Sequence, residues 1–333
     1  MRIEAFSEGK YQDDPDANED QFLLLPGRGY AVIDGVTDIS GRMYEGMRTG
    51  RLASRIVQRA ATEFLADPAT TGKSAETLIE RASAALRAEY VRRGLLEEVR
   101  ADPQKRFGAT LTVAVDLGRS FRFIVIGDSG LRLDGAEVVV VDTGLDLVTA
   151  ALRQEAYRLV EEAGGDLDAK RRVSRACSFH GAAALHPDMQ PWLDAARLVE
   201  LSRRSLARCR TRFPQVPVAD IEWLLAHGIG GQTRYQNNTG SPLSYAVLDG
   251  FDVPLPLVRV FDRPRESLRT IELFTDGYFK PAVTPDVAAW ETAFAEVERI
   301  DPEKIDAYPS VKGTVGRTRT DDRTVVIVHL QME

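Results

Sequence analysis

The chain has 333 residues, of which 44% are hydrophobic, and this is enough for a sizeable core in one large domain or two smaller ones. Its formal net charge is −7 and it has no basic tail, which excludes nucleic acid as a partner because binding to a phosphate backbone needs clustered Lys and Arg. Two cysteines give no disulfide framework, and no signal core or membrane-length apolar run occurs, so we expect a soluble, cytoplasmic protein with no membrane partner.

The N-terminal part of the chain predicts a β-hairpin. Two short apolar runs, at 22–25 and 30–33, flank a glycine turn. Folding this hairpin would bring Glu19 and Asp20, which precede it, close to Asp34, which follows it. Gathered carboxylates repel one another unless a cation neutralises them, which indicates a site for a hard metal ion. The same acids are also typical of solvated turns, and these residues alone leave the two interpretations equally open.

Along the rest of the chain, the spacing of apolar residues alternates between that of helices and that of strands. Apolar residues spaced by three and four predict helices at 53–65 and 74–93, and from residue 107 the period changes to two. Strands are expected at 2–6, 108–115, 121–126, 137–141, 257–261, 268–274 and 324–330. Further helices are expected at 147–163, 192–213, 221–227 and 287–300.

Acids recur at the ends of the predicted strands. Asp34, Asp128 and Asp276 each follow an apolar strand and precede glycine or serine. Asp321 stands at the opposite, entering end of the last strand. Carboxylates at the strand ends of a sheet core are typical oxygen ligands of hard cations, so the pattern favours a metal site over solvated turns.

Six short motifs resemble, in order, those of the type 2C metal-dependent Ser/Thr protein phosphatases, the PPM family. Each motif is weak by itself, but six in the right order are specific. They are Asn18-Glu19-Asp20, Ala31-Val32-Ile33-Asp34-Gly35, Gly108-Ala109-Thr110, Gly127-Asp128-Ser129, Phe274-Thr275-Asp276-Gly277 and Asp321-Asp322-Arg323-Thr324-Val325. The chain is thereby identified as a divergent, bacterial-type member.

The resemblance implies an α+β fold, a four-layer α-β-β-α sandwich of two antiparallel sheets flanked by helices. It also implies one type 2C-like phosphatase domain over residues 1–333. Only the range 165–243 has no counterpart, and we interpret it as a mainly helical insertion near the rim of the active site. The cysteines and histidines of that range fit no compact zinc motif and are better interpreted as ordinary core or surface residues.

The resemblance assigns roles to the acids. Asp34 would bridge two metal ions, with Glu19 and the carbonyl of Gly35 on one of them. Asp276 and Asp321 would bind the other ion.

Two more acids have implied roles. Asp20 would hydrogen-bond waters on the metals, and Asp128 would help to hold a third, weaker metal. Asp20, Asp34, Asp276 and Asp321 together are the expected catalytic residues.

The implied activity is that of a phosphoprotein phosphatase dependent on Mn²⁺ or Mg²⁺, which hydrolyses Ser/Thr phosphomonoesters through a water activated by two metal ions. The implied partner is a phosphorylated protein, for instance a Ser/Thr kinase or one of its substrates, in cytoplasmic signalling. The alternative is a catalytically weak type 2C-like regulatory protein that binds a phosphoprotein or another partner.

Departures from the family pattern bear on activity. Pro15 stands where the family usually has a phosphate-binding arginine, Lys280 where some members have another metal-binding acid, and Asp322 where asparagine is more usual. A guanidinium binds phosphate bidentately and proline offers no donor, so we expect weaker substrate binding unless another arginine compensates. The candidates beside the matched motifs are Arg42, Arg317 and Arg319.

Overall fold

The computed structural model describes residues 1–37, 41–68 and 74–330. The chain divides into two compact units. Unit 1 comprises Met1–Asp142, Tyr245–Glu296 and Gly316–Glu333, and unit 2 comprises Thr143–Ser244 and Val297–Val315.

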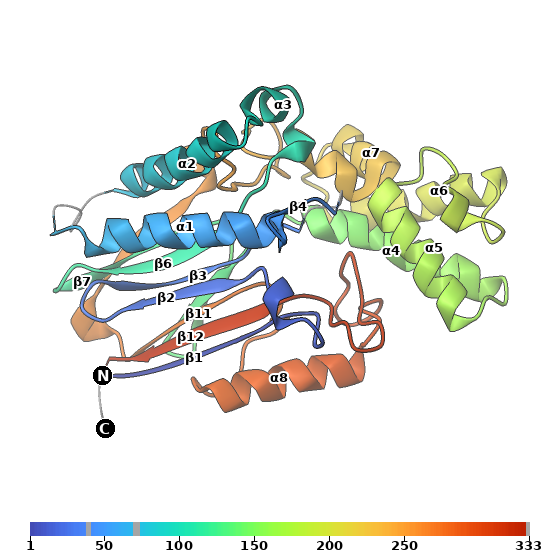
Figure 1. Ribbon diagram of the computed structural model, residues 1–333. Helices are drawn as coiled ribbons and strands as arrows, with labels where there is room; N and C mark the ends of the chain where they lie inside the picture. Colours follow the sequence, from blue (N-terminus) through green and yellow to red (C-terminus); the bar gives the residue numbers. More distant parts are fainter. Residues whose placement is uncertain (38–40, 69–73, 331–333) are drawn as a thin grey trace. The chain divides into compact units, whose positions relative to one another are not determined.

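Unit 1 contains two five-stranded sheets in which every neighbouring pair of strands is antiparallel (Figure 1). The first sheet runs in the order β1 (Arg2–Glu8), β12 (Arg323–His329), β11 (Thr270–Phe274), β8 (Gly130–Leu133) and β9 (Glu137–Val139). The second runs in the order β10 (Arg259–Pro264), β7 (Ser120–Ile126), β6 (Leu111–Asp116), β3 (Gly29–Ile33) and β2 (Gln21–Leu25). A small hairpin joins β4 (Met43–Tyr44) to β5 (Met47–Arg48).

Strand β3 shows how the sequence places the sheets between helices. All five of its residues are buried, because successive side chains enter different apolar clusters. Tyr30 and Val32 pack between the two sheets, with Leu273 of β11 and Val326 of β12 among their neighbours in that cluster. Ile33, in contrast, belongs to the cluster on the outer face of the second sheet.

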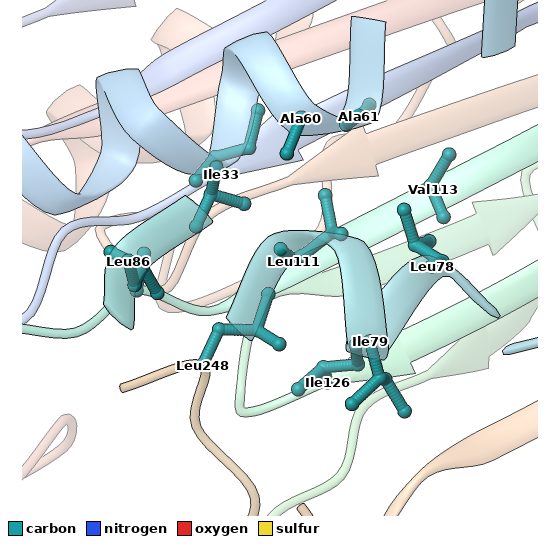
Figure 2. Close-up of a cluster of buried hydrophobic side chains, with 14 of the residues drawn as sticks. Ile33, Ala60, Ala61, Leu78, Ile79, Leu86, Leu111, Val113, Ile126 and Leu248 are labelled. Atoms are coloured by element: carbon teal, nitrogen blue, oxygen red, sulfur yellow. The ribbon is translucent and has the colours of Figure 1, made fainter. Parts of the chain in front are cut away.

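Helices cover the outer faces of both sheets in unit 1. The second sheet is covered by α1 (Thr49–Ala66), α2 (Ala75–Arg92) and the short α3 (Leu96–Ala101). Figure 2 shows Ala60 of α1 and Leu78 of α2 in the cluster that includes Leu111 of β6. The first sheet is covered by α8 (Val287–Ile300), whose Trp290 and Phe294 join Phe274 and Val325 in a third cluster. The predicted four-layer α-β-β-α arrangement is confirmed.

Unit 2 is built around α4 (Leu145–Glu162), which packs against α5 (Leu167–His180), α6 (Ala195–Arg212) and α7 (Val218–His227). The segment 297–315 belongs to the same unit, because the buried guanidinium of Arg153 in α4 donates hydrogen bonds to three of its carbonyls. The compact unit is thus larger than the range 165–243, whose interpretation as an insertion within one domain stays a prediction. No helix within the described ranges combines the length and the apolar character that crossing a membrane requires.

Candidate metal centre

The β2–β3 hairpin brings its three acids to one end, as the sequence predicts. Gln21 pairs with Ile33 in the register of the two strands, so Asp20 and Asp34 lie just beyond the same end of the ladder. The carbonyl of Asp34 is held by the backbone N–H of Thr110 at 2.8 Å, which fixes the chain where it leaves β3.

The first sheet supplies acids to the same end of the sandwich. Asp276 follows β11 and Asp321 precedes β12, and the N–H of Thr275 donates to the carbonyl of Thr324 between those two strands at 3.0 Å. The hydroxyl of Thr275 also donates to Oδ2 of Asp20 at 2.7 Å. This bond joins the strand ends of the two sheets, and the acids that the sequence predicts therefore gather at one place.

The charges of these carboxyls shift one another's pKa values within unit 1. The pKa of Asp34 is raised well above its ordinary value by burial and by the charges of the carboxyls nearby, which are Asp276, Asp20, Asp321 and Asp128. Burial, together with the charge of Asp322, raises the pKa of Asp20 to about 7. Burial also raises the pKa of Asp128, and the charges of Asp142 and Asp321 add to it.

Three carboxylate oxygens at this site are buried without a hydrogen-bond partner among the described residues. They are Oε1 of Glu19, Oδ1 of Asp20 and Oδ1 of Asp128. Buried polar atoms are almost always paired in native proteins, so three unpaired acceptors together fit a cation. Within the described part of the chain, however, no three His, Cys, Asp or Glu side chains already converge as a set of metal ligands.

Two glycines let the first turn of α1 approach Glu19. A Cβ atom on Gly50 would lie 2.5 Å from Oε1 of Glu19 and 2.7 Å from the carbonyl oxygen of Gly35. A Cβ atom on Gly35 would lie 2.2 Å from the carbonyl oxygen of Gly50. Side chains at either position would therefore separate the Gly35 carbonyl from Glu19, the two groups expected to share a metal ion.

Sequence reasoning missed Lys10, which lies inside this site. Its side chain is 4% exposed, and Nζ donates to Oε2 of Glu19 at 2.8 Å, to Oδ1 of Asp321 at 3.1 Å and to Oγ1 of Thr37 at 3.0 Å. Nζ also lies 3.0 Å from Oδ2 of Asp322. Burial alone would lower the pKa of Lys10, but the charges of Asp321, Asp322 and Glu19 raise it above its ordinary value, so the ammonium stays charged.

The register of the strands is the signal that would have found this lysine. Glu8 at the end of β1 lies opposite Arg323 at the start of β12, so the residues just after β1 lie beside Asp321 and Asp322. Nothing in the local sequence around Lys10 reports that pairing.

The structure places two of the departures from the family pattern and one of the candidate arginines as follows. Pro15 is exposed and begins a short 3₁₀ turn, Pro15–Ala17. Lys280 forms an ion pair with Glu296. The backbone N–H of Arg319 donates to the carbonyl of Lys10 at 2.9 Å, which puts Arg319 beside the site.

The two other candidate arginines and Arg51, all in unit 1, bind acids or backbone. Nη2 of Arg42 lies 3.1 Å from Oε1 of Glu98, and Nη1 of Arg317 lies 2.9 Å from Oδ1 of Asp13. Arg51, which sequence reasoning did not single out, donates to the carbonyl of Asn18 at 2.8 Å. Arg51 is therefore a further arginine next to the metal-ligand motif.

Comparison with known families matches residues 16–306 to protein phosphatase 2C, so the chain belongs to the protein phosphatase 2C family. The membership that the six motifs predict is confirmed. Lys10, Asp321 and Asp322 lie outside the matched range. A search among proteins of curated function finds no match.

Solved bacterial phosphatases resemble the chain over nearly its whole length. The serine/threonine phosphatase PstP/Ppp of Mycobacterium tuberculosis is 16% identical, with 99% of each chain covered and a TM-score of 0.46. Stp1 of Staphylococcus aureus is 11% identical, with 100% of this chain and 96% of that chain covered and a TM-score of 0.48. The catalytic domain of PstP in complex with two manganese ions is 16% identical, with 98% and 96% covered and a TM-score of 0.44.

Proposed function

We propose that the protein is a phosphoprotein phosphatase that depends on Mn²⁺ or Mg²⁺ and removes phosphate from Ser or Thr of cytoplasmic proteins, among them a Ser/Thr kinase or its substrates. The observation that carries this proposal is the set of three buried, unpaired carboxylate oxygens on Glu19, Asp20 and Asp128. Such a set in a phosphatase family indicates a cation site rather than a solvated turn.

The residues present fit two divalent ions in the roles given above. Asp34 would bridge them, Asp276 and Asp321 would hold one, and Glu19 with the Gly35 carbonyl would hold the other. A third, weaker ion would lie at Asp128. When bound, the ions would supply positive charge to the phosphoryl oxygens and to the attacking water.

The protein's own residues orient the parts of the site. Thr275 fixes the Asp20 carboxylate through Oδ2, and Oδ1 of Asp20, which has no partner among the described residues, is able to accept a hydrogen bond from a water molecule. Oδ2 of Asp322 accepts the backbone N–H of Glu19 at 3.3 Å and so fixes the backbone that carries Glu19.

Asp276→Asn tests the proposal, because an amide supplies a weaker, uncharged oxygen to a site that holds cations. We expect this variant to lose nearly all Mn²⁺-dependent hydrolysis of an aryl phosphate and to bind Mn²⁺ more weakly. Asp252→Asn is the matched control, since the side chain of Asp252 is fully exposed. Unchanged turnover in Asp276→Asn, or full turnover of the wild type in the presence of a chelator, would contradict the proposal.

Two observations favour a second candidate, a catalytically weak relative that binds phosphoproteins without turning them over. Proline stands at position 15, and Lys10 neutralises part of the acid cluster. A wild-type protein that binds a phosphopeptide but hydrolyses no aryl phosphate at saturating Mn²⁺ would support this candidate over the first.

A further inference from the structure

A buried lysine joins two acids that are expected to bind different metal ions. Glu19 and Asp321 both accept hydrogen bonds from Nζ of Lys10, at 2.8 and 3.1 Å. The ammonium therefore stands between the two halves of the candidate metal centre, where a divalent cation would otherwise be the source of positive charge.

The lysine is held by backbone as well as by side-chain contacts. Its own N–H donates to Oδ1 of Asp322 at 2.7 Å, and its carbonyl accepts the N–H of Arg319 at 2.9 Å. Oδ2 of Asp322 lies 3.0 Å from Nζ. Because both its backbone and its ammonium are anchored to the segment before β12, Lys10 is a fixed part of the site and not a surface side chain that happens to fold inward.

The two carboxylate oxygens of Glu19 differ in their contacts. Oε2 accepts from Nζ of Lys10 and from the hydroxyl of Thr37, each at 2.8 Å. Oε1, on the side of Gly50, has no partner among the described residues. A divalent ion on Glu19 would have to share one carboxylate with an ammonium that is already bound to it, and the two positive charges would repel each other.

We propose that Lys10 is a built-in cation that competes with a divalent ion for Glu19 and weakens the binding of that ion. This inference rests on the proposed metal centre and adds a difference in affinity. The wild-type chain binds the ion on Glu19 more weakly than a chain whose Lys10 is neutral.

The test is the affinity for Mn²⁺, measured by calorimetric titration of the whole chain, wild type against Lys10→Gln. We expect Lys10→Gln to bind one of its Mn²⁺ ions more tightly than the wild type does. Lys105→Gln is the matched control, because Lys105 of unit 1 also pairs with two acids, Glu98 and Asp102, but lies 35% exposed and outside the cluster. We expect it to bind Mn²⁺ with the wild-type affinity.

A double variant shows which ion changes. Lys10→Gln with Glu19→Gln should lose the gain in affinity, since that gain depends on the Glu19 carboxylate. A gain that persists in the double variant would overturn the proposal, and so would equal affinities in wild type and Lys10→Gln. If neither protein binds Mn²⁺ at all, the proposed metal centre itself fails, which is a separate result.

Stability gives a second readout that does not depend on activity. Removing the ammonium leaves Glu19, Asp321 and Asp322 without their buried counter-charge, which destabilises the metal-free protein. Saturating Mn²⁺ should therefore raise the melting temperature of Lys10→Gln more than that of the wild type. A Lys10→Gln protein that folds only when Mn²⁺ is present is the same result in its extreme form, and an equal rise in melting temperature for both proteins would contradict the proposal.

Discussion

Thr275 lies directly before Asp276, and its hydroxyl makes two hydrogen bonds at the edge of the acid cluster. It donates to Oδ2 of Asp20 at 2.7 Å and accepts the backbone N–H of Thr324 at 2.9 Å. Both partners are buried, so a side chain of the same shape without the hydroxyl leaves a carboxylate and an N–H unpaired.

We therefore predict that Thr275→Val lowers kcat for an aryl phosphate and costs about 1–3 kcal/mol of stability for each polar group that loses its partner. Steady-state kinetics and urea unfolding measure the two effects. Thr275→Ser keeps the hydroxyl and is the control. Equal kcat for the valine and serine variants would mean that the orientation of Asp20 does not matter to turnover.

The sequence predicts the acids of the site far better than their partners. The pattern of a strand followed by Asp and a small residue identifies Asp34, Asp128 and Asp276, because strand ends of one sandwich meet at one edge. Lys10 has no such local signal. Its partners Asp321 and Asp322 are more than 300 positions away in the chain, and only the pairing of β1 with β12 brings them to it.

At the scale of elements, one buried ion pair holds β8, β11 and α8 together. Arg132 of β8 and Glu272 of β11 lie opposite each other in the strand register and are 3% and 0% exposed. Oε2 of Glu272 also accepts the indole N–H of Trp290 in α8 at 2.8 Å, and Arg132 donates to the carbonyl of Ala282.

Glu272→Leu should destabilise unit 1 by about 3–5 kcal/mol, because it leaves a buried guanidinium without a counter-charge. The matched control is Asp262→Leu, which breaks the partly exposed cross-strand pair with Arg122 and should cost only about 0–1 kcal/mol. Urea unfolding measures both. Adding Arg132→Leu to Glu272→Leu should recover part of the loss, and a double variant less stable than the single one would refute this account.

Asp301, the residue after α8, organises the loop that follows in unit 2. Its carboxylate accepts the backbone N–H groups of Ile305, Asp306 and Tyr308 at 3.0, 3.0 and 2.9 Å. Burial by itself raises the pKa of Asp301, but these three donors, with that of Tyr308 first, outweigh it and hold the pKa below its usual value.

A lowered pKa in the folded state fixes the sign of the pH dependence. The stability that Asp301 contributes is complete above the unfolded-state pKa of about 3.9 and is lost as the pH falls through the lower folded-state pKa. We predict that Asp301→Asn makes the chain less stable at neutral pH and reduces the loss of stability between neutral pH and pH 3. Urea unfolding followed at several pH values tests this, and parallel pH curves for the two proteins would contradict it.

No helix range is predicted for α5 itself, although α5 lies within the range 165–243 that we interpret as mainly helical. The residues that it buries are mostly small, and they include Ala169, Ser174, Ala176, Cys177 and Ser178. A buried face made of alanine, serine and cysteine carries no strong apolar stripe, so the helical period is weak in the sequence even though the face is well packed. The flanking helices, which bury leucine and valine, were predicted.

On the scale of the whole molecule, the candidate metal centre belongs entirely to unit 1. The two cysteines of the chain are both in unit 2, buried in α5 and α6. Each unit also has its own buried core, and α4 is central to the core of unit 2.

A ligand that binds only one unit should stabilise that unit first. At a Mn²⁺ concentration 100 times the dissociation constant the gain is about 2.7 kcal/mol. We predict that Mn²⁺ slows amide hydrogen exchange in β3, β11 and β12 and leaves α5 and α6 unchanged. Exchange followed by mass spectrometry measures both, and an equal gain of protection in α5 and α6 would show that the two units open together.

The pairing of β1 with β12 also sets the order of events during synthesis on the ribosome. Strand β1 leaves the ribosome long before its partner in the ladder, β12, which pairs with it from Arg2 opposite His329 to Glu8 opposite Arg323. Until then one edge of β11 stays open, and Lys10 lacks the carboxylates 311 and 312 positions later. Contacts so distant in the chain form slowly and late. The nascent protein therefore carries an unfinished acid cluster until Asp322 has emerged from the ribosome.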